Sequence, residues 1–294
     1  MKKLLSLVFF LSIVMIQCNL EDQEQDQEDN QIRIIYPSWT EGIATTSLIK
    51  EILTNRLNYS VITKMDEIDS VYAAVASGNY DFFTDAWLPH THSSYWEKHK
   101  DSLVDLGVIF RNARTGIVVP DYMDIDSMTQ INQLPGGKRV IYGIDAFAGI
   151  MESSRNALEH YNIMAELIEE NESEMLKRLE EAYRMRKDIM ITGWVPHWMF
   201  KRYDLKFLAD PDTIYGGTEN IHILGRKGIR EDYPTLTIFL ERISLANQQM
   251  NSLINEIEAT EGLPERGAKN WIDDNITTVN SWIHGLRVKR RYSE

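Results

Sequence analysis

The chain has 294 residues, 43% of them hydrophobic and 26% charged, so it can bury a large core and is neither disordered nor a small disulfide scaffold. Acidic residues outnumber Lys and Arg by 44 to 31, which gives a formal net charge of −13. This excess argues against nucleic acid, whose phosphates need basic partners. The single cysteine, Cys18, excludes an intramolecular disulfide and a cysteine-based metal or redox site.

The first 17 residues have the pattern of an export signal. Lys2 and Lys3 precede an apolar run over 4–16, which is too short to cross a hydrocarbon core of about 30 Å as a helix. The arrangement up to Cys18 resembles a bacterial lipoprotein signal, although Gln17 stands where a small residue is usual. The resemblance implies cleavage after residue 17 and lipid on Cys18. The alternative is an ordinary signal peptide with an incidental cysteine.

An acidic segment follows, and we assign residues 18–31 to a flexible tether. Residues 19–31 contain six acidic side chains and no basic ones, with too little apolar surface to fold. No second hydrophobic segment is present in the sequence. We therefore expect an exported globular body that a lipid anchor holds at a membrane, facing the periplasm or the cell exterior.

From residue 32 onward, predicted strands alternate with predicted helices. Ser38 and Glu41 have the spacing of a capping box at the start of the first helix. Strands are expected at 32–36, 61–63, 80–84, around 118, and at 139–142, 188–192 and 221–224; further helices are expected around 71–76 and at 150–160, 172–185, 233–246, 251–260 and 268–284. This alternation predicts an α/β protein with a mostly parallel sheet.

Three of the seven tryptophans follow predicted strands: Trp39, Trp87 and Trp194. Ligands of open α/β sheets bind outside the carboxyl ends of the strands, so these rings are expected at a cleft. The alternative is that each ring simply fills the core. Trp87 and Trp194 are both followed by x-Pro-His, which makes coincidence less probable.

Aromatic rings without an accompanying acid, base or nucleophile indicate binding and not catalysis. A quaternary ammonium group has no N–H to donate, so its main attraction is to the faces of aromatic rings, at up to about 2 kcal/mol for a desolvated contact. The sequence thus predicts a cage for such a cation, no enzymatic activity and no cofactor.

Five segments carry a family resemblance: SWTEGIATT, GNYDFFTDAWLPHTHSSYW, GIVVPDYM, YGIDAFAGIM and ITGWVPHWMF. They resemble substrate-binding proteins of glycine betaine/proline betaine/choline ABC transporters, from about residue 32 to the end. The resemblance implies a two-lobed periplasmic-binding-protein fold that closes on its ligand. Lobe I is expected at 32–115 and 217–294, and lobe II at 116–216. Trp39, Trp87 and Trp194 are expected to form the cation cage.

The resemblance also implies a site for a ligand carboxylate. His92 stands five residues after Trp87, where betaine binders of the family hold the carboxylate. The backbone N–H groups of Gly149 and Ile150 are the other expected donors, and free N–H groups at a helix start do bind anions. Phe147 is bulkier than the small residue expected there, so it either narrows the pocket or packs outward. A cation cage beside an anion site matches a betaine zwitterion.

Two further groups of residues have competing interpretations. Glu41 matches an acidic position that meets the ligand hydroxyl in choline-binding relatives, but we favour a helix-capping role. His90, His92, His99 and His197 lack the spacing of a metal motif, so no metal site is expected.

We therefore expect a binding protein that delivers glycine betaine or proline betaine to an ABC permease. A choline or carnitine binder of the same transporter class is the first alternative. A surface lipoprotein that binds a host or partner protein is the second.

Overall fold

The computed structural model describes residues 31–135 and 138–286. The predicted signal at 1–17, the lipidation site Cys18 and all of the predicted tether except Gln31 lie outside the described residues. Within the described ranges, no helix is both long and apolar enough to cross a membrane.

A nine-stranded sheet runs through the molecule in the order β2-β1-β3-β9-β4-β7-β5-β6, with β8 paired to β4. The outer pairs β1–β2, β1–β3, β5–β6 and β5–β7 are parallel, whereas β4 and β9 pair antiparallel with their neighbours. The strands are β1 (Gln31–Tyr36), β2 (Ser60–Met65), β3 (Phe82–Leu88), β4 (Leu103–Pro120), β5 (Arg139–Tyr142), β6 (Ala165–Ile168), β7 (Met190–Val195), β8 (Leu205–Phe207) and β9 (Glu219–Arg226). Parallel strands joined by helices confirm the α/β class.

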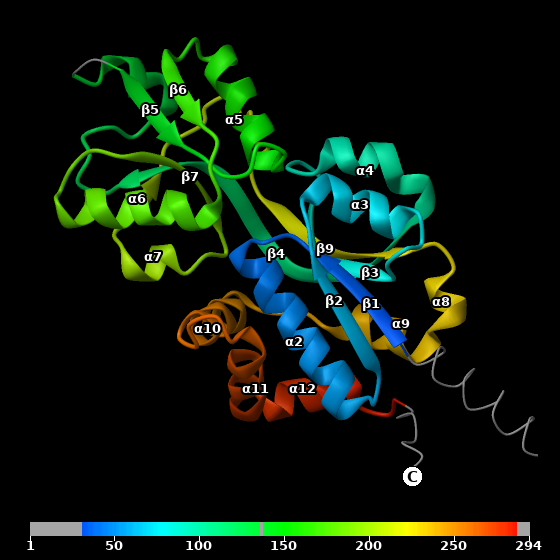
Figure 1. Cartoon of the computed structure of the whole chain (residues 1–294). Helices are drawn as coiled ribbons and strands as arrows, with labels where there is room; N and C mark the ends of the chain where they lie inside the picture. The colour runs from blue at the N-terminus through cyan, green and yellow to red at the C-terminus, as the bar shows by residue number, and fades with distance from the viewer. Residues whose placement is uncertain (1–30, 136–137, 287–294) are drawn as a thin grey trace, which may run out of the picture.

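The long strand β4 connects two groups of strands (Figure 1). It pairs with β9 from Leu103 to Ala113 and with β7 from Arg114 to Val118. We call residues 31–113 with 219–286 the first half and residues 114–218 the second half. The lobe bounds expected from the sequence stay a prediction.

Helices cover both halves of the sheet (Figure 1). The first half carries α2 (Thr40–Arg56), α3 (Ile68–Ala76), α4 (Ser93–His99), α8 (Ile229–Asp232), α9 (Pro234–Arg242), α10 (Asn247–Glu258), α11 (Pro264–Asp274) and α12 (Ile276–Ile283); the second carries α5 (Gly149–His160), α6 (Glu172–Arg184) and α7 (Met199–Arg202). The single helix expected at 268–284 is wrong, because α11 ends before Asn275. The Asn275 side chain donates to the carbonyl of Trp271 at 2.9 Å, which terminates that helix.

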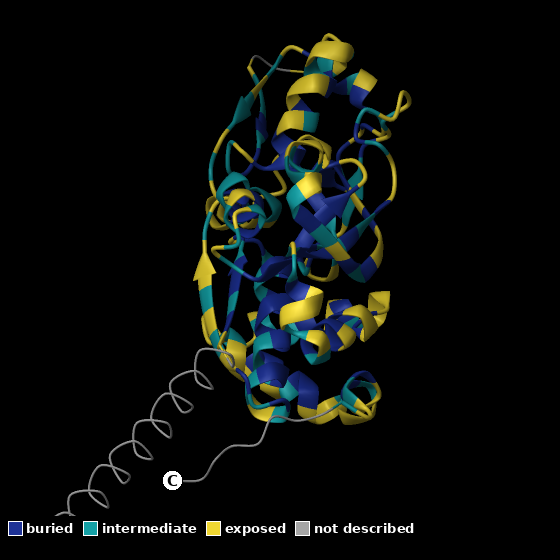
Figure 2. Cartoon of the chain, turned by 90° about the vertical axis from the view of Figure 1, so that its right-hand side faces the viewer, coloured by how far each residue is buried: buried dark blue, intermediate teal, exposed yellow. Residues whose placement is uncertain are grey.

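The core extends along both halves, and the exposed residues lie on the outer faces of helices, in loops and on the edge strand β2 (Figure 2). All seven residues of β3 are buried, because β3 lies inside the sheet and is covered on both sides. Phe82 and Phe83 of β3 are fully buried, and burying such a side chain stabilises the fold by about 1.5–3 kcal/mol. The same strand buries Thr84 and Asp85, two polar residues that call for an explanation.

Candidate ligand-binding site

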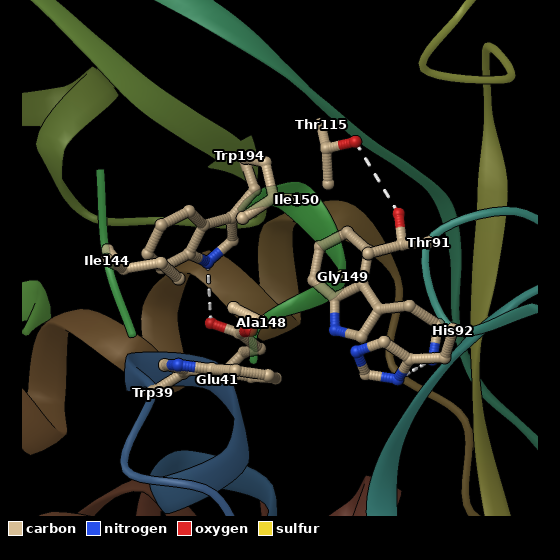
Figure 3. A pocket seen from close by; sticks show the side chains of 11 residues that line it. Trp39, Glu41, Thr91, His92, Thr115, Ile144, Ala148, Gly149, Ile150 and Trp194 are labelled. Atoms are coloured by element: carbon tan, nitrogen blue, oxygen red, sulfur yellow. Dashed lines mark hydrogen bonds between the residues drawn. The ribbon is translucent and has the colours of Figure 1, made fainter. Parts of the chain in front are cut away.

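A small cavity lies where the two halves meet (Figure 3). Its lining consists of Trp39, Glu41, Trp87, Thr91, His92, Thr115, Ile144, Ala148, Gly149, Ile150 and Trp194. Every residue that the sequence singled out as a ligand contact is in this lining. Thr91, Thr115, Ile144 and Ala148 also line the cavity but were not expected, although Thr91, Ile144 and Ala148 lie within the segments that carry the family resemblance.

The three tryptophans reach the cavity from the ends of three strands. Trp39 lies just after β1 and directly precedes α2, while Trp87 and Trp194 are the second-last residues of β3 and β7. All three side chains are at most 6% exposed. The carboxyl ends of strands from both halves therefore converge on one cavity, as expected for an open α/β sheet.

Each of the three indole N–H groups donates to a carboxylate. Two of these hydrogen bonds cross between the halves, and Figure 3 shows the one that joins Trp194 to Glu41. The pairs are Trp39–Asp145 at 3.1 Å, Trp87–Asp85 at 2.8 Å and Trp194–Glu41 at 2.8 Å. The rings are thus held in orientation, and their polar N–H groups are satisfied. The faces of the three rings are thereby left for a cation.

Glu41 does not have the capping role that we favoured from the sequence. The N-cap of α2 is Trp39, with no side-chain cap, and Ser38 is exposed. The buried Glu41 carboxylate instead accepts from Trp194. Burial raises the pKa of Glu41 well above its usual range, and the nearby charges of Asp85 and Glu172 raise it further. The capping box was therefore wrong, because tertiary contacts engage its glutamate.

Asp85 is a second buried acid beside the cavity. Its Oδ1 accepts from the indole of Trp87, while its Oδ2 has no partner among the described residues. Burial raises the pKa of Asp85 from 3.8 to about 7. Asp85 was not expected as a site residue from the sequence, although an acidic residue within the mostly apolar segment FFTDAW is an unusual feature that could have marked it.

We expect the raised pKa of Asp85 to be visible in the pH dependence of stability. Between about pH 4 and 7 the folded protein retains a proton that the unfolded chain releases. The unfolding free energy therefore falls as pH rises through this window, by about 1.4 kcal/mol per pH unit for one proton. Asp85→Asn should lose this term, so the stability of the variant relative to wild type should increase from pH 5 to pH 7 in urea unfolding.

The exposed Asp124→Asn serves as the control and should keep the wild-type slope. The Asp85 charge also raises the pKa of Glu41, so the Glu41 contribution changes in Asp85→Asn in the same direction. The remaining titrating groups are common to all three proteins and cancel in the comparison. Parallel pH profiles for wild type and Asp85→Asn would contradict the assignment.

His92 presents a hydrogen-bond donor to the cavity. The backbone N–H of Trp87 donates to His92 Nδ1 at 3.1 Å, so the ring proton is on Nε2. Burial lowers the pKa of His92 to about 3, which keeps the ring neutral. The buried Nε2 has no partner among the described residues. This N–H is therefore available to an acceptor on a ligand.

The start of α5 supplies the opposite wall with free backbone donors. Gly149 and Ile150 are its first two residues, and Ala148 caps it without a side-chain bond. Among the described residues, neither N–H donates a backbone hydrogen bond, as expected for a first helical turn. A β-carbon on Gly149 would lie 1.9 Å from the carbonyl oxygen of Thr91 in the first half. The two halves therefore approach backbone to backbone here.

Phe147 faces outward, which resolves the two interpretations of this residue. Its side chain is 55% exposed and is not part of the cavity lining. Its carbonyl accepts from the hydroxyl of Tyr95 at 2.6 Å, another contact between the halves. The bulk of this side chain does not narrow the inner cavity.

Taken together, these groups can hold a small zwitterion. Three ring faces with carboxylates behind them suit a cation, and the donors on His92, Gly149 and Ile150 suit an anion. Within the described ranges, no group of three or more His, Cys, Asp or Glu side chains is placed to hold a metal ion.

Comparison with known proteins places the chain among transport proteins. Residues 30–274 match the family described as the substrate-binding domain of ABC-type glycine betaine transport systems. The glycine betaine/carnitine transport binding protein GbuC of Listeria monocytogenes is 39% identical over 150 residues, which cover 50% of this chain and 49% of GbuC. The chain thus spans about half the length of this curated relative.

Solved structures agree over most of the chain. Lactococcal OpuAC, in its closed conformation with glycine betaine, has a TM-score of 0.82 and 32% identity, covering 86% of this chain and 99% of OpuAC. ProX of Borrelia burgdorferi has a TM-score of 0.81 and 29% identity, and the match covers 87% of this chain and 97% of ProX. The fold is also shared by an ABC-transporter choline-binding protein, which has 23% identity and a TM-score of 0.80. The match covers 89% of this chain and 94% of that protein. The chain belongs to the family of substrate-binding domains of ABC-type glycine betaine transport systems, which are binding proteins and not enzymes.

Proposed function

We propose that this chain binds glycine betaine or a related carboxylated quaternary amine, such as proline betaine, and delivers it to an ABC permease outside the cytoplasm. Its relatives include GbuC, named for glycine betaine and carnitine, and OpuAC, which was solved with glycine betaine. These names support the ligand class, and the cavity supports a choice within it.

One observation carries the proposal: the Nε2–H of His92 is a buried donor without a protein partner, in the same cavity as the three indole rings. A buried donor that stays unpaired costs about 1–3 kcal/mol, so a ligand that supplies an acceptor gains affinity. A carboxylate supplies that acceptor and also meets the N–H groups of Gly149 and Ile150. A ligand without a carboxylate leaves all of these donors unpaired.

The anchor in this proposal is lipid on Cys18. The basic start, the apolar run over 4–16 and the position of the only cysteine support it. The acidic segment 19–31 would then separate the anchored end from the folded body. This arrangement keeps the binding cavity close to a membrane-embedded permease.

Choline or carnitine is the second candidate, and the position of Glu41 favours it. Glu41 lines the cavity and is not a helix cap, so its carboxylate is available to a ligand hydroxyl. Its Oε2 already accepts from Trp194, which leaves Oε1 for such a contact.

Titration calorimetry with glycine betaine, proline betaine, choline, carnitine and proline tests the proposal directly. We expect the two betaines to bind most tightly and proline, which lacks a quaternary centre, to bind weakly. Trp194→Ala should weaken every quaternary ligand by about 1–2 kcal/mol, or roughly 5- to 30-fold, because one ring face is lost.

Met164→Ala is the control, since this side chain is 74% exposed in the same half, and it should bind like wild type. If no quaternary amine binds to the wild-type protein, the proposed function is wrong. If choline binds and glycine betaine does not, the second candidate replaces the first.

A further inference from the structure

Glu172 is a buried acid outside the cavity lining, at the first position of α6 in the second half. Its side chain is only 9% exposed. A buried carboxylate needs several donors to offset its loss of hydration. Those donors come from both halves of the molecule.

The first set of donors belongs to Thr40 at the start of α2, in the other half. The backbone N–H of Thr40 donates to Glu172 Oε2 at 3.0 Å, and the Thr40 hydroxyl donates to Oε1. Helix α2 has no side-chain cap of its own. Glu172 therefore caps a helix to which it is not connected locally, and its negative charge lies at the positive end of the α2 dipole.

The second donor is His197, which packs against a wall of the cage. Its Nδ1 accepts from the N–H of Met199 at 3.0 Å, so its Nε2 carries the proton and donates to Glu172 Oε1 at 3.0 Å. The ring centroids of His197 and Trp194 lie 4.9 Å apart, and the two ring planes make an angle of 86°. Glu172 thus joins the residue next to Trp39 with the residue that supports Trp194.

We propose that Glu172 is a positioning residue that latches the two halves in the closed state, and so holds Trp39 and Trp194 around the bound cation. The proposal rests on the proposed function for the identity of the ligand. When the halves separate, Glu172 must leave Thr40, and the start of α2 loses its cap. Each departure of a ligand therefore requires these hydrogen bonds to break.

Closure also brings Glu172 close enough to Glu41 and Asp85 for its charge to raise the pKa of both carboxyl groups, so bringing these groups together has a cost that opposes the latch. A cation between the rings would favour the charged forms of these carboxyl groups and so offset part of this cost. We therefore expect the closed state to be most stable around a positively charged group, whether or not the ligand also has a carboxylate.

The test compares Glu172→Gln with Glu174→Gln. Glu174 is in the same helical turn, but its side chain is 50% exposed and pairs with Lys177, so its variant removes a charge without touching Thr40. Glutamine retains one acceptor oxygen for three donors. We expect Glu172→Gln to weaken glycine betaine and choline alike by at least about 10-fold, mainly through faster dissociation, while Glu174→Gln stays within twofold of wild type.

A distance measurement separates a latch from a general loss of stability. Met65 and Phe147, which are 46% and 55% exposed, line an outer pocket from opposite halves. Spin labels on Met65→Cys and Phe147→Cys, in the full chain with Cys18→Ser, report closure by electron paramagnetic resonance. With saturating ligand, wild type should show the short distance and Glu172→Gln a persistent longer one.

Affinity within twofold of wild type, or an equally short distance in the saturated variant, overturns the latch and leaves the proposed function intact. A lower unfolding midpoint with unchanged closure also overturns it, because Glu172 would then be merely structural. If wild type binds no quaternary amine, the proposed function fails first and the latch has no ligand to retain.

Discussion

Gly149→Ala is expected to lower the affinity for every quaternary amine by about 150-fold while leaving the protein folded. The added β-carbon would lie 1.9 Å from the carbonyl oxygen of Thr91, and a backbone oxygen cannot rotate away as a side chain can. Overpacking of this kind costs about 1–3 kcal/mol, and the rigid partner places this case at the upper end. Because Thr91 and Gly149 belong to different halves, the collision arises only on closure.

Calorimetry with glycine betaine measures the effect, and the unfolding midpoint without ligand shows whether the fold survives. Asn156→Ala is the control, since Asn156 is exposed on the same helix and should bind like wild type. Affinity of Gly149→Ala within a few-fold of wild type would show that this backbone contact is not needed for binding.

His92→Ala is expected to separate betaine from choline. Removing the Nε2–H donor should weaken glycine betaine by about 1.5–3 kcal/mol, or roughly 10- to 150-fold, because hydrogen bonds to charged groups have this magnitude. Choline has no carboxylate and should change by less than about twofold. Since the pKa of His92 is about 3, the ring stays neutral, and its contribution to betaine binding should be constant between pH 5 and 8.

His92 also accepts from the backbone of Trp87, so a second variant guards against local distortion. His92→Asn retains an oxygen near the Nδ1 position and should show the same selective loss. The exposed His160→Ala should change neither ligand. Equal losses for betaine and choline would contradict a carboxylate role, and loss of choline binding in Glu41→Gln with undetectable betaine binding would favour the second candidate.

The sequence predicted the fold class and seven of the eleven residues that line the cavity, four of these only through the family resemblance. Helical and strand periodicities are local, so β5 was predicted with its observed bounds, and α5 and α6 within one residue. The rule that strand ends converge brought Trp39, Trp87 and Trp194 together, although 155 residues separate the first from the last. The edge strand β6 and the three-residue β8 were missed, because short, half-buried strands carry little alternation.

Only the tertiary structure decided which hydrogen-bond donors each carboxylate accepts from. The local pattern at Ser38 and Glu41 predicted a capping box, yet closure brings Trp194 to Glu41 and Glu172 to the start of α2. Asp85 and Asp145 likewise gained their roles through contact with indole N–H groups. A buried carboxylate takes whichever donors the packing brings within reach, and here those donors are mostly distant in the chain and partly in the other half. Local spacing therefore identifies the rings and the strands, whereas the hydrogen bonds that orient them depend on how the two halves close.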